Sequence, residues 1–116
     1  MTPPIQSFAD FWPYYLSQHR HPACRLLHFV GTTAFIGIDA WALIVQPVGM
    51  LWLLLLAPVV AYGCAWVGHL WIEGNRPATF GHPLWSLLAD FRMYGWMLTG
   101  RLWTGDLADR VPQPAD

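Results

Sequence analysis

The chain has 116 residues, of which 55% are hydrophobic and only 11% are charged. So small a charged fraction lies outside the range of ordinary soluble domains and favours a membrane protein. The formal net charge is −1 and the chain contains no lysine, so its composition gives no basis for binding nucleic acid. The length fits one small domain, residues 1–116, with a loose, polar tail at 104–116.

Residues 7–19 are expected to form a short amphipathic helix, because their apolar side chains recur at helical spacing. The apolar positions are Phe8, Phe11, Trp12, Tyr15 and Leu16. Pro13 leaves two possible starts for this helix. Either Ser7 and Asp10 form a capping turn that ends early, or the helix begins at Pro13, where the missing N–H costs nothing.

Two apolar arms follow, at Phe29–Val45 and Gly49–Ile72. The second has 24 residues without Asp, Glu, Lys, Arg or Asn, which is enough to cross a bilayer. The first has 17 residues and contains Asp39, so it is short for a span on its own. The turn between them carries no charge, and together the arms predict a membrane hairpin.

A further helix is expected over Pro83–Trp103, after a loop that contains Gly74 and Pro77. Its apolar sequence is interrupted by Ser86, Asp90 and Arg92, so it is either a third span with a polar face or a helix lying in the interface. The predicted fold is therefore an all-α integral membrane bundle of two spanning helices, this third helix and the N-terminal amphipathic helix. So small a bundle is compatible with homo-oligomers.

Histidines lie only at the outer ends of the two arms. In an up-and-down hairpin, His28 and His69 must return to the same membrane face, and His19 and His82 flank the same ends. Several imidazoles on one face of a small bundle suggest a bound metal ion, because neutral imidazole suits Fe, Zn and Cu. The sequence thus predicts a histidine-rich metal site at this face.

Charges at the arm ends predict which side of the membrane carries this site. Arg20 and Arg25 precede the first arm and Arg76 follows the second, whereas the turn has no basic residue. The positive-inside rule therefore places the histidines at the cytoplasmic face of a bacterial inner membrane or the endoplasmic reticulum.

Charged neighbours extend the candidate site. His69 and Glu73 have i, i+4 spacing, and Arg76 follows on the same stripe, so Glu73 is expected to face the site as a catalytic residue. Asp90 either forms an internal structural pair with Arg92 or is a catalytic residue that orients a ligand imidazole. Arg25 and Arg76 are candidates for binding a substrate anion.

Residues 11–32 and 68–102, about half of the chain, resemble the Mpo1-like family, also called domain of unknown function 962. The pieces that carry the resemblance are His19, the Cys24-Arg25-x-x-His28 stretch followed by Gly31, and Gly68-His69 followed by Glu73, Asn75, Arg76 and Pro77. The characterised fungal member is an iron(II)-dependent dioxygenase of fatty-acid α-oxidation in the endoplasmic reticulum membrane.

The resemblance implies an Fe(II) enzyme that takes a 2-hydroxy fatty acid and O2 to the one-carbon-shorter acid and CO2. His19, His28 and His69 carry over as iron ligands, and His82 is a further candidate ligand. Three other interpretations stay open: a haem protein with His28 and His69 as axial ligands, a zinc hydrolase, and a non-catalytic membrane adaptor.

Overall fold

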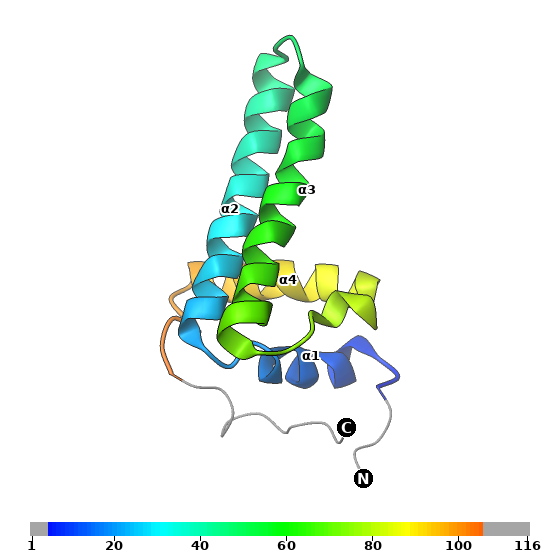
Figure 1. The fold of residues 1–116 in the computed structure, drawn as a ribbon, viewed down its shortest axis with the longest axis vertical. Coiled ribbons are helices and arrows are strands. Elements are labelled where there is room, and N and C mark those ends of the chain that lie inside the picture. Colours follow the sequence, from blue (N-terminus) through cyan, green and yellow to red (C-terminus); the bar gives the residue numbers. More distant parts are fainter. Residues whose placement is uncertain (1–4, 106–116) are drawn as a thin grey trace.

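The computed structural model describes residues 5–105, and within them every regular element is helical. The elements are α1 (Phe8–Ser17), α2 (Pro22–Val45), α3 (Met50–Val67), a π-helical segment (Gly68–Glu73), a 3₁₀ turn (Ala78–Phe80) and α4 (Pro83–Leu98). Figure 1 shows α2 and α3 as a long antiparallel hairpin, with α1 and α4 lying crosswise near its base. By base we mean the end of the hairpin that holds Pro22 and Glu73.

The first helix begins at Ser7, whose Oγ accepts a hydrogen bond from the Asp10 backbone N–H at 3.1 Å. The capping turn is therefore correct, but the helix does not end early: it continues through Pro13 to Ser17. Pro13 removes only one backbone hydrogen bond. The buried side of α1 packs in one hydrophobic cluster with Met93 and Met97 of α4, which holds the helix together across the proline.

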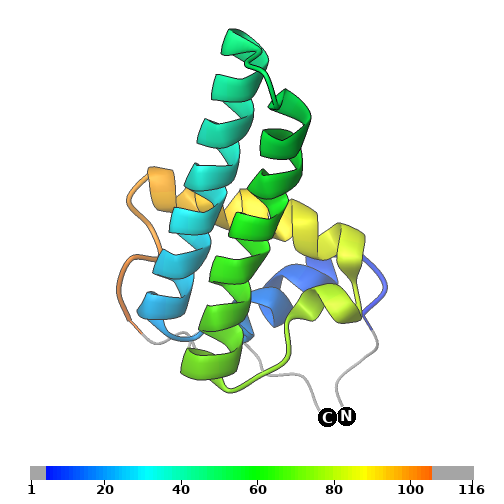
Figure 2. The same cartoon turned by 45° about the horizontal axis from the view of Figure 1, so that its top comes forward.

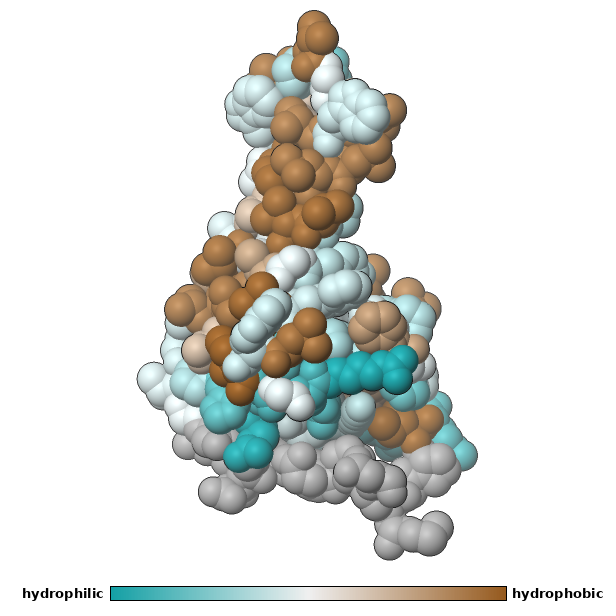
Figure 3. All heavy atoms as spheres, in the orientation of Figure 1, coloured by the Kyte–Doolittle hydropathy of each residue, from teal (hydrophilic) through white to brown (hydrophobic). Residues whose placement is uncertain are grey.

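The first arm is longer than its apolar run, because α2 begins at Pro22 rather than at Phe29. A proline at the first helical position is favourable, since its missing N–H would have had no helical partner. The structure has two helices long and apolar enough to cross a membrane, Pro22–Val45 and Met50–Glu73. Only 17% and 6% of their most apolar stretches are buried, unlike a core helix of a soluble protein. Figure 3 shows the resulting apolar surface along the hairpin, with the most hydrophilic atoms at the base.

Two glycines let α2 and α3 approach closely near the base. A Cβ added at Gly31 would lie 3.0 Å from the Ala61 carbonyl oxygen and from Cys64 Cβ. At Gly68 it would lie 2.9 Å from Cys24 Sγ. A side chain at Gly31 would press on the backbone of α3, and one at Gly68 would displace the Cys24 side chain. Glycine at both positions therefore favours this close helix spacing, which brings the two histidines of the hairpin together.

The last helix, α4, has 16 residues and crosses the hairpin instead of running along it, as the two views in Figures 1 and 2 show. It is not among the helices long and apolar enough to span. The Arg92 guanidinium lies 4.4 Å from the centre of the Trp12 ring, which joins α4 to α1. Within the described residues, α4 is therefore a helix that lies across the two candidate spans, and its placement in the membrane interface stays a prediction.

Candidate metal centre

Three histidines from three separate elements meet at the base of the hairpin. His19 lies in the loop after α1, His28 in the second turn of α2 and His69 in the π-helical segment. Their side chains are 1%, 6% and 2% exposed. One nitrogen of each ring lies within 4.8 Å of the others, and the Nε2 atoms of His19 and His28 are 3.1 Å apart.

The outer nitrogen of each ring is held by an oxygen acceptor. His19 Nδ1 donates to the Tyr15 carbonyl at 2.6 Å, and His28 Nδ1 donates to the Cys24 carbonyl at 2.9 Å. Carbonyl oxygens can only accept, so both rings carry their proton on Nδ1 and present the Nε2 lone pair inward. This ring orientation is the one that outer hydrogen bonds impose on metal-binding histidines.

The third ring is oriented by Asn75. His69 Nδ1 lies 2.7 Å from Asn75 Oδ1, and Asn75 Nδ2 donates to the carbonyl and to Oε1 of Gln18 at 3.0 and 3.1 Å. Because two acceptors fix the amide nitrogen, the amide oxygen must face His69 and accept its Nδ1 hydrogen. Asn75 therefore joins the His69 ring to the loop that carries His19.

The π-helical segment brings Asn75 into place. The helix α3 widens to i→i+5 bonding at Gly68–Glu73 and then ends at Gly74. The Asn75 backbone N–H donates back to the His69 carbonyl at 3.0 Å, which sets its side chain beside the same residue. Single π turns of this kind are frequent at functional sites.

Electrostatics favour a cation among the three rings. Burial, and next the neighbouring His28 and His69, hold the pKa of His19 well below its usual value. The ring therefore stays neutral, and a second proton does not relieve the repulsion between the inward-facing lone pairs. Two nitrogens about 2.1 Å from one ion at angles of about 90–110° would stand about 3.0–3.4 Å apart. The 3.1 Å separation of His19 and His28 fits that requirement.

A hydrogen-bonded pair supports the site from the α4 side. The Tyr15 hydroxyl donates to Asp90 Oδ1, while the Tyr15 carbonyl accepts from His19. Burial raises the pKa of Asp90 to about 7, and burial together with Asp90 raises the pKa of Tyr15. Asp90 thus reaches His19 through Tyr15, and not by direct contact with an imidazole as the sequence suggested.

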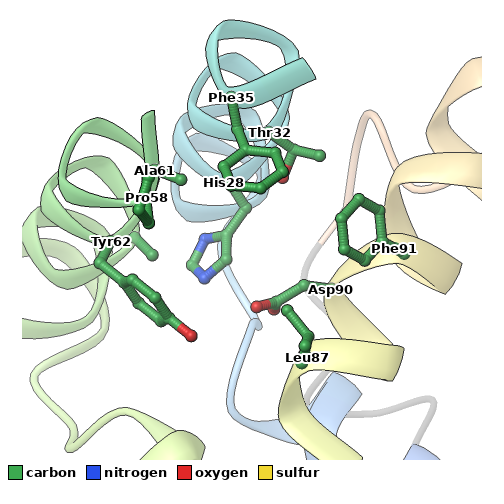
Figure 4. A pocket seen from close by; sticks show the side chains of 10 residues that line it. His28, Thr32, Phe35, Pro58, Ala61, Tyr62, Leu87, Asp90 and Phe91 are labelled. Atoms are coloured by element: carbon green, nitrogen blue, oxygen red, sulfur yellow. The ribbon is translucent and has the colours of Figure 1, made fainter. Parts of the chain in front are cut away.

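Two adjoining hollows open from the rings. The polar hollow contains the three histidines, with Tyr15, Trp66, Ser86 and Asp90 in its lining. The apolar groove runs up the hairpin between α2, α3 and α4, and Figure 4 shows the His28 ring between Tyr62 and Asp90 at its lower end. The two hollows share His28, Tyr62, Ala65 and Asp90.

Residues 5–102 match the family model described as 2-hydroxy-palmitic acid dioxygenase Mpo1-like. The chain belongs to this family. The match includes all three histidines and every residue that lines the two hollows, and it confirms the resemblance seen in the sequence. Comparison with curated proteins and with solved structures gives no match.

The structure does not bring His82 to the other three histidines of this Mpo1-like protein. His82 precedes α4, and its ring stacks on Trp85 at 5.5 Å and contacts Phe11 at 5.2 Å. The metal-binding group found among the described residues is His19, His28 and His69. The predicted fourth ligand is thus placed among aromatic side chains outside that group.

Glu73 also lies apart from the rings. Its buried carboxylate accepts a hydrogen bond from the His21 backbone N–H at 2.8 Å, and it is in the lining of neither hollow. The i, i+4 spacing from His69 predicted that Glu73 faces the site, but the segment is π-helical and the Glu73 carboxylate contacts the His21 backbone instead. Glu73 ties the loop that carries His19 to the end of the π-helical segment.

Both predicted anion-binding arginines have other partners. Arg25 is fully buried and donates to five carbonyl oxygens, those of His19, Arg20, Leu102, Thr104 and Gly105. Arg25 therefore holds the start of the tail, and the tail from residue 106 onward lies outside the described residues. Arg76 does not continue the helical stripe, because the helix ends at Gly74, and it lies 5.0 Å over the Phe80 ring.

Sequence reasoning gave no role to two residues that support this site. Asn75 was part of the family resemblance, and its place directly after the helix-ending Gly74 was the available signal. Tyr15 was placed on an apolar stripe, and nothing local shows that its hydroxyl reaches Asp90, 75 residues away. Contacts of such sequence separation become visible only in the folded chain.

Proposed function

We propose that this chain is an iron(II)-dependent dioxygenase of fatty-acid α-oxidation, in which a 2-hydroxy fatty acid and O2 give the one-carbon-shorter acid, CO2 and water. The observation that supports this most is the three-histidine cluster, with its lone pairs directed inward, at the polar end of an apolar groove. The family description names the same substrate class.

The proposed reaction balances without another reductant. Loss of the carboxyl carbon as CO2 and oxidation of the hydroxyl-bearing carbon to a carboxyl release four electrons, and the reduction of O2 consumes four. The chain therefore needs no flavin and no 2-oxoglutarate for this turnover.

We infer that His19, His28 and His69 hold the metal ion. Imidazole donors suit iron, zinc and copper, and the oxygenase description of the family favours Fe(II) among them. Bound there, iron would supply the one-electron chemistry with O2, at coordination positions that three protein ligands leave open. The Nδ1 hydrogen bonds hold the three rings in one orientation, so little rearrangement is needed on binding.

A haem between histidines suits this geometry poorly. Axial ligands on opposite sides of a haem iron have their nitrogens about 4 Å apart, with the porphyrin between them. The Nε2 atoms of His19 and His28 are 3.1 Å apart, and the His69 ring centre lies 4.6 Å and 5.0 Å from theirs. His28 and His69, the pair that a haem would use, have ring centres 5.0 Å apart, and the His19 ring centre lies within 4.6 Å of both, where a macrocycle would need space.

The substrate is proposed to lie with its polar end at the histidines and its alkyl chain in the apolar groove. His28, Tyr62 and Asp90 border both hollows, so the carbon atoms beside the carboxyl would pass between them. Farther up, the lining is apolar and includes Phe35, Pro58 and Phe91. The remaining alkyl chain would follow the exposed apolar surface of the hairpin in the bilayer.

The contacts of Asp90 and Glu73 suggest different roles for the two carboxylates. Asp90 faces the substrate at the junction of the hollows and holds Tyr15, which in turn orients His19. Glu73 acts at a distance by fixing the His21 backbone. We therefore propose Asp90 as the carboxylate that contacts substrate and Glu73 as a positioning residue.

We further propose that the hairpin crosses the membrane with its base in the cytoplasm. The chain has no Arg or Lys between residues 26 and 75, whereas Arg25 lies in the first turn of α2 and Arg76 follows the π-helical segment, both at the base of the hairpin. The positive-inside rule gives this orientation for a bacterial inner membrane or for the endoplasmic reticulum. Substrate would then enter from the cytoplasmic leaflet.

The test is metal analysis and an absorption spectrum of anaerobically purified, detergent-solubilised protein, followed by O2 uptake with 2-hydroxyhexadecanoate. We expect iron bound to the protein, no Soret band, and one CO2 and one pentadecanoate released for each O2 consumed. Hexadecanoate, which lacks the hydroxyl, is the control and should give no O2 uptake. Zinc without O2 uptake would support a hydrolase, a Soret band a cytochrome, and absence of any metal an adaptor; each would overturn the proposal.

A further inference from the structure

Ser86 is a buried hydroxyl without a partner inside the polar hollow. Its side chain is 4% exposed, and its Oγ makes no hydrogen bond to any described residue. A serine within a helix commonly bonds the carbonyl one turn earlier, but here the His82 carbonyl receives only the Ser86 backbone N–H, at 2.9 Å. A buried hydroxyl left unpaired costs free energy, so this donor is available to a ligand that enters the hollow.

The residues around the two hollows offer no positively charged side chain to a ligand. Neither lining contains an arginine or a lysine. Arg25 is engaged by backbone carbonyls and Arg76 lies over Phe80, so neither predicted anion partner faces the rings. A carboxylate that enters this hollow loses its water and must find neutral donors beside any metal ion.

The position of Ser86 suits such a carboxylate. It lies near the start of α4, where the positive end of the helix dipole favours negative charge. It is one turn before Asp90, whose Oδ1 already accepts from the Tyr15 hydroxyl. Ser86 and Asp90 line the same hollow as the three histidines, so the Ser86 hydroxyl can donate to a group that lies beside the rings.

We propose that Ser86 Oγ donates a hydrogen bond to the carboxylate of the bound fatty acid, and so selects acids over uncharged long-chain alcohols. This inference rests on the proposed function, since it names the residue that recognises the acid group of that substrate. Ser86 is a binding residue in this scheme and takes no part in holding the metal.

The test compares ligands that differ only in the acid group, with metal-loaded protein kept anaerobic so that no turnover occurs. Binding of 2-hydroxyhexadecanoate, hexadecanoate and hexadecane-1,2-diol is measured through tryptophan fluorescence, because Trp66 lines the polar hollow. Ser86→Ala should weaken both acids about 10-fold or more, as loss of a hydrogen bond to a charged group does, and leave the diol within about twofold. Metal content should not change.

Two further variants control this experiment. Ser86→Thr keeps the hydroxyl and should keep acid binding. Thr99→Ala removes a hydroxyl just after the same helix, one that donates to the Trp96 carbonyl at 2.7 Å outside the hollows, and should bind every ligand as wild type does. Equal weakening of acids and diol by Ser86→Ala, or no weakening of the acids, would overturn the proposal.

The outcomes also separate this inference from the proposed function. Ser86-dependent binding of acids without O2 uptake would leave the carboxylate contact in place and refute the dioxygenase. Normal acid binding by Ser86→Ala with full turnover would refute the contact and keep the dioxygenase.

Discussion

The Nε2 atoms of His19 and His28 lie 3.1 Å apart, although each ring donates its only neutral-state hydrogen away from the other, to a backbone carbonyl. Two lone pairs at this distance repel unless a cation lies beside them. A bound metal ion would therefore relieve the repulsion between these nitrogens, with His69 as the third donor.

Replacing one of these rings should remove the metal. His28→Ala or His69→Ala is expected to lower bound iron to a few per cent of wild type, because two imidazoles are too few for tight binding. His21→Ala and His82→Ala are the controls, since neither belongs to the cluster. Iron per chain, measured after gel filtration, checks this; loss of iron from His82→Ala equal to that from His28→Ala would restore His82 as a ligand.

Asn75 should control metal affinity without touching the ion. Asn75→Ala removes the acceptor for His69 Nδ1 and the link to Gln18, so we expect affinity to fall about 10- to 100-fold. Asn75→Asp keeps an oxygen acceptor for His69 and should lose less. Competition with a chelator of known affinity measures both, and an unchanged affinity in Asn75→Ala would contradict the orienting role.

The close approach of α2 and α3 predicts opposite outcomes at two glycines of one helix. Gly31→Ala places a Cβ 3.0 Å from the Ala61 carbonyl, so the helices must separate, at a cost of about 1–3 kcal/mol and with weaker metal binding. Gly37→Ala meets nothing within 4 Å and should be neutral or slightly stabilising. Thermal unfolding in detergent distinguishes them; similar midpoints for the two variants would refute this account of the packing.

The metal-free protein should lose stability with rising pH through Asp90. Burial raises the pKa of Asp90 from 3.8 to about 7, so between these values the folded state keeps a proton that the unfolded state releases. The free energy of unfolding is therefore not reduced by Asp90 below pH 4, falls as the pH rises towards 7, and falls no further above that pH. The difference in unfolding free energy between wild type and Asp90→Asn should fall over this window by up to a few kcal/mol; parallel pH curves would contradict it.

The apolar groove should be sensitive to its width. Ala61→Phe adds a ring to the groove lining and is expected to raise KM for 2-hydroxyhexadecanoate several-fold, with bound metal unchanged. Leu55→Phe is the matched control, because Leu55 lies on the same helix, is exposed and does not line the groove. The O2 electrode gives both values; equal KM values would place the alkyl chain elsewhere.

Helical periodicity and hairpin topology could be predicted from local pattern alone. The 24 uncharged residues of the second arm require a helix, and an up-and-down pair must return His28 and His69 to one end. The same pattern placed His19 and His82 beside that end, and the family motif marked His19 as a ligand. The start of α2 at Pro22, ahead of the apolar run, also follows from local chemistry, because a proline is favoured at the first position of a helix.

The tertiary structure decided which side chains complete the site. Residues 18–21 and 74–82 have no helical periodicity that fixes their direction, and their paths depend on distant partners: Asn75 on Gln18, Glu73 on His21. Packing between distant segments also places the Arg25 guanidinium against backbone carbonyls, and it leaves the Ser86 hydroxyl without a partner in the hollow. Spacing along a chain sets the face of one helix, whereas the angle between helices and the path of each loop come from packing between segments far apart in sequence.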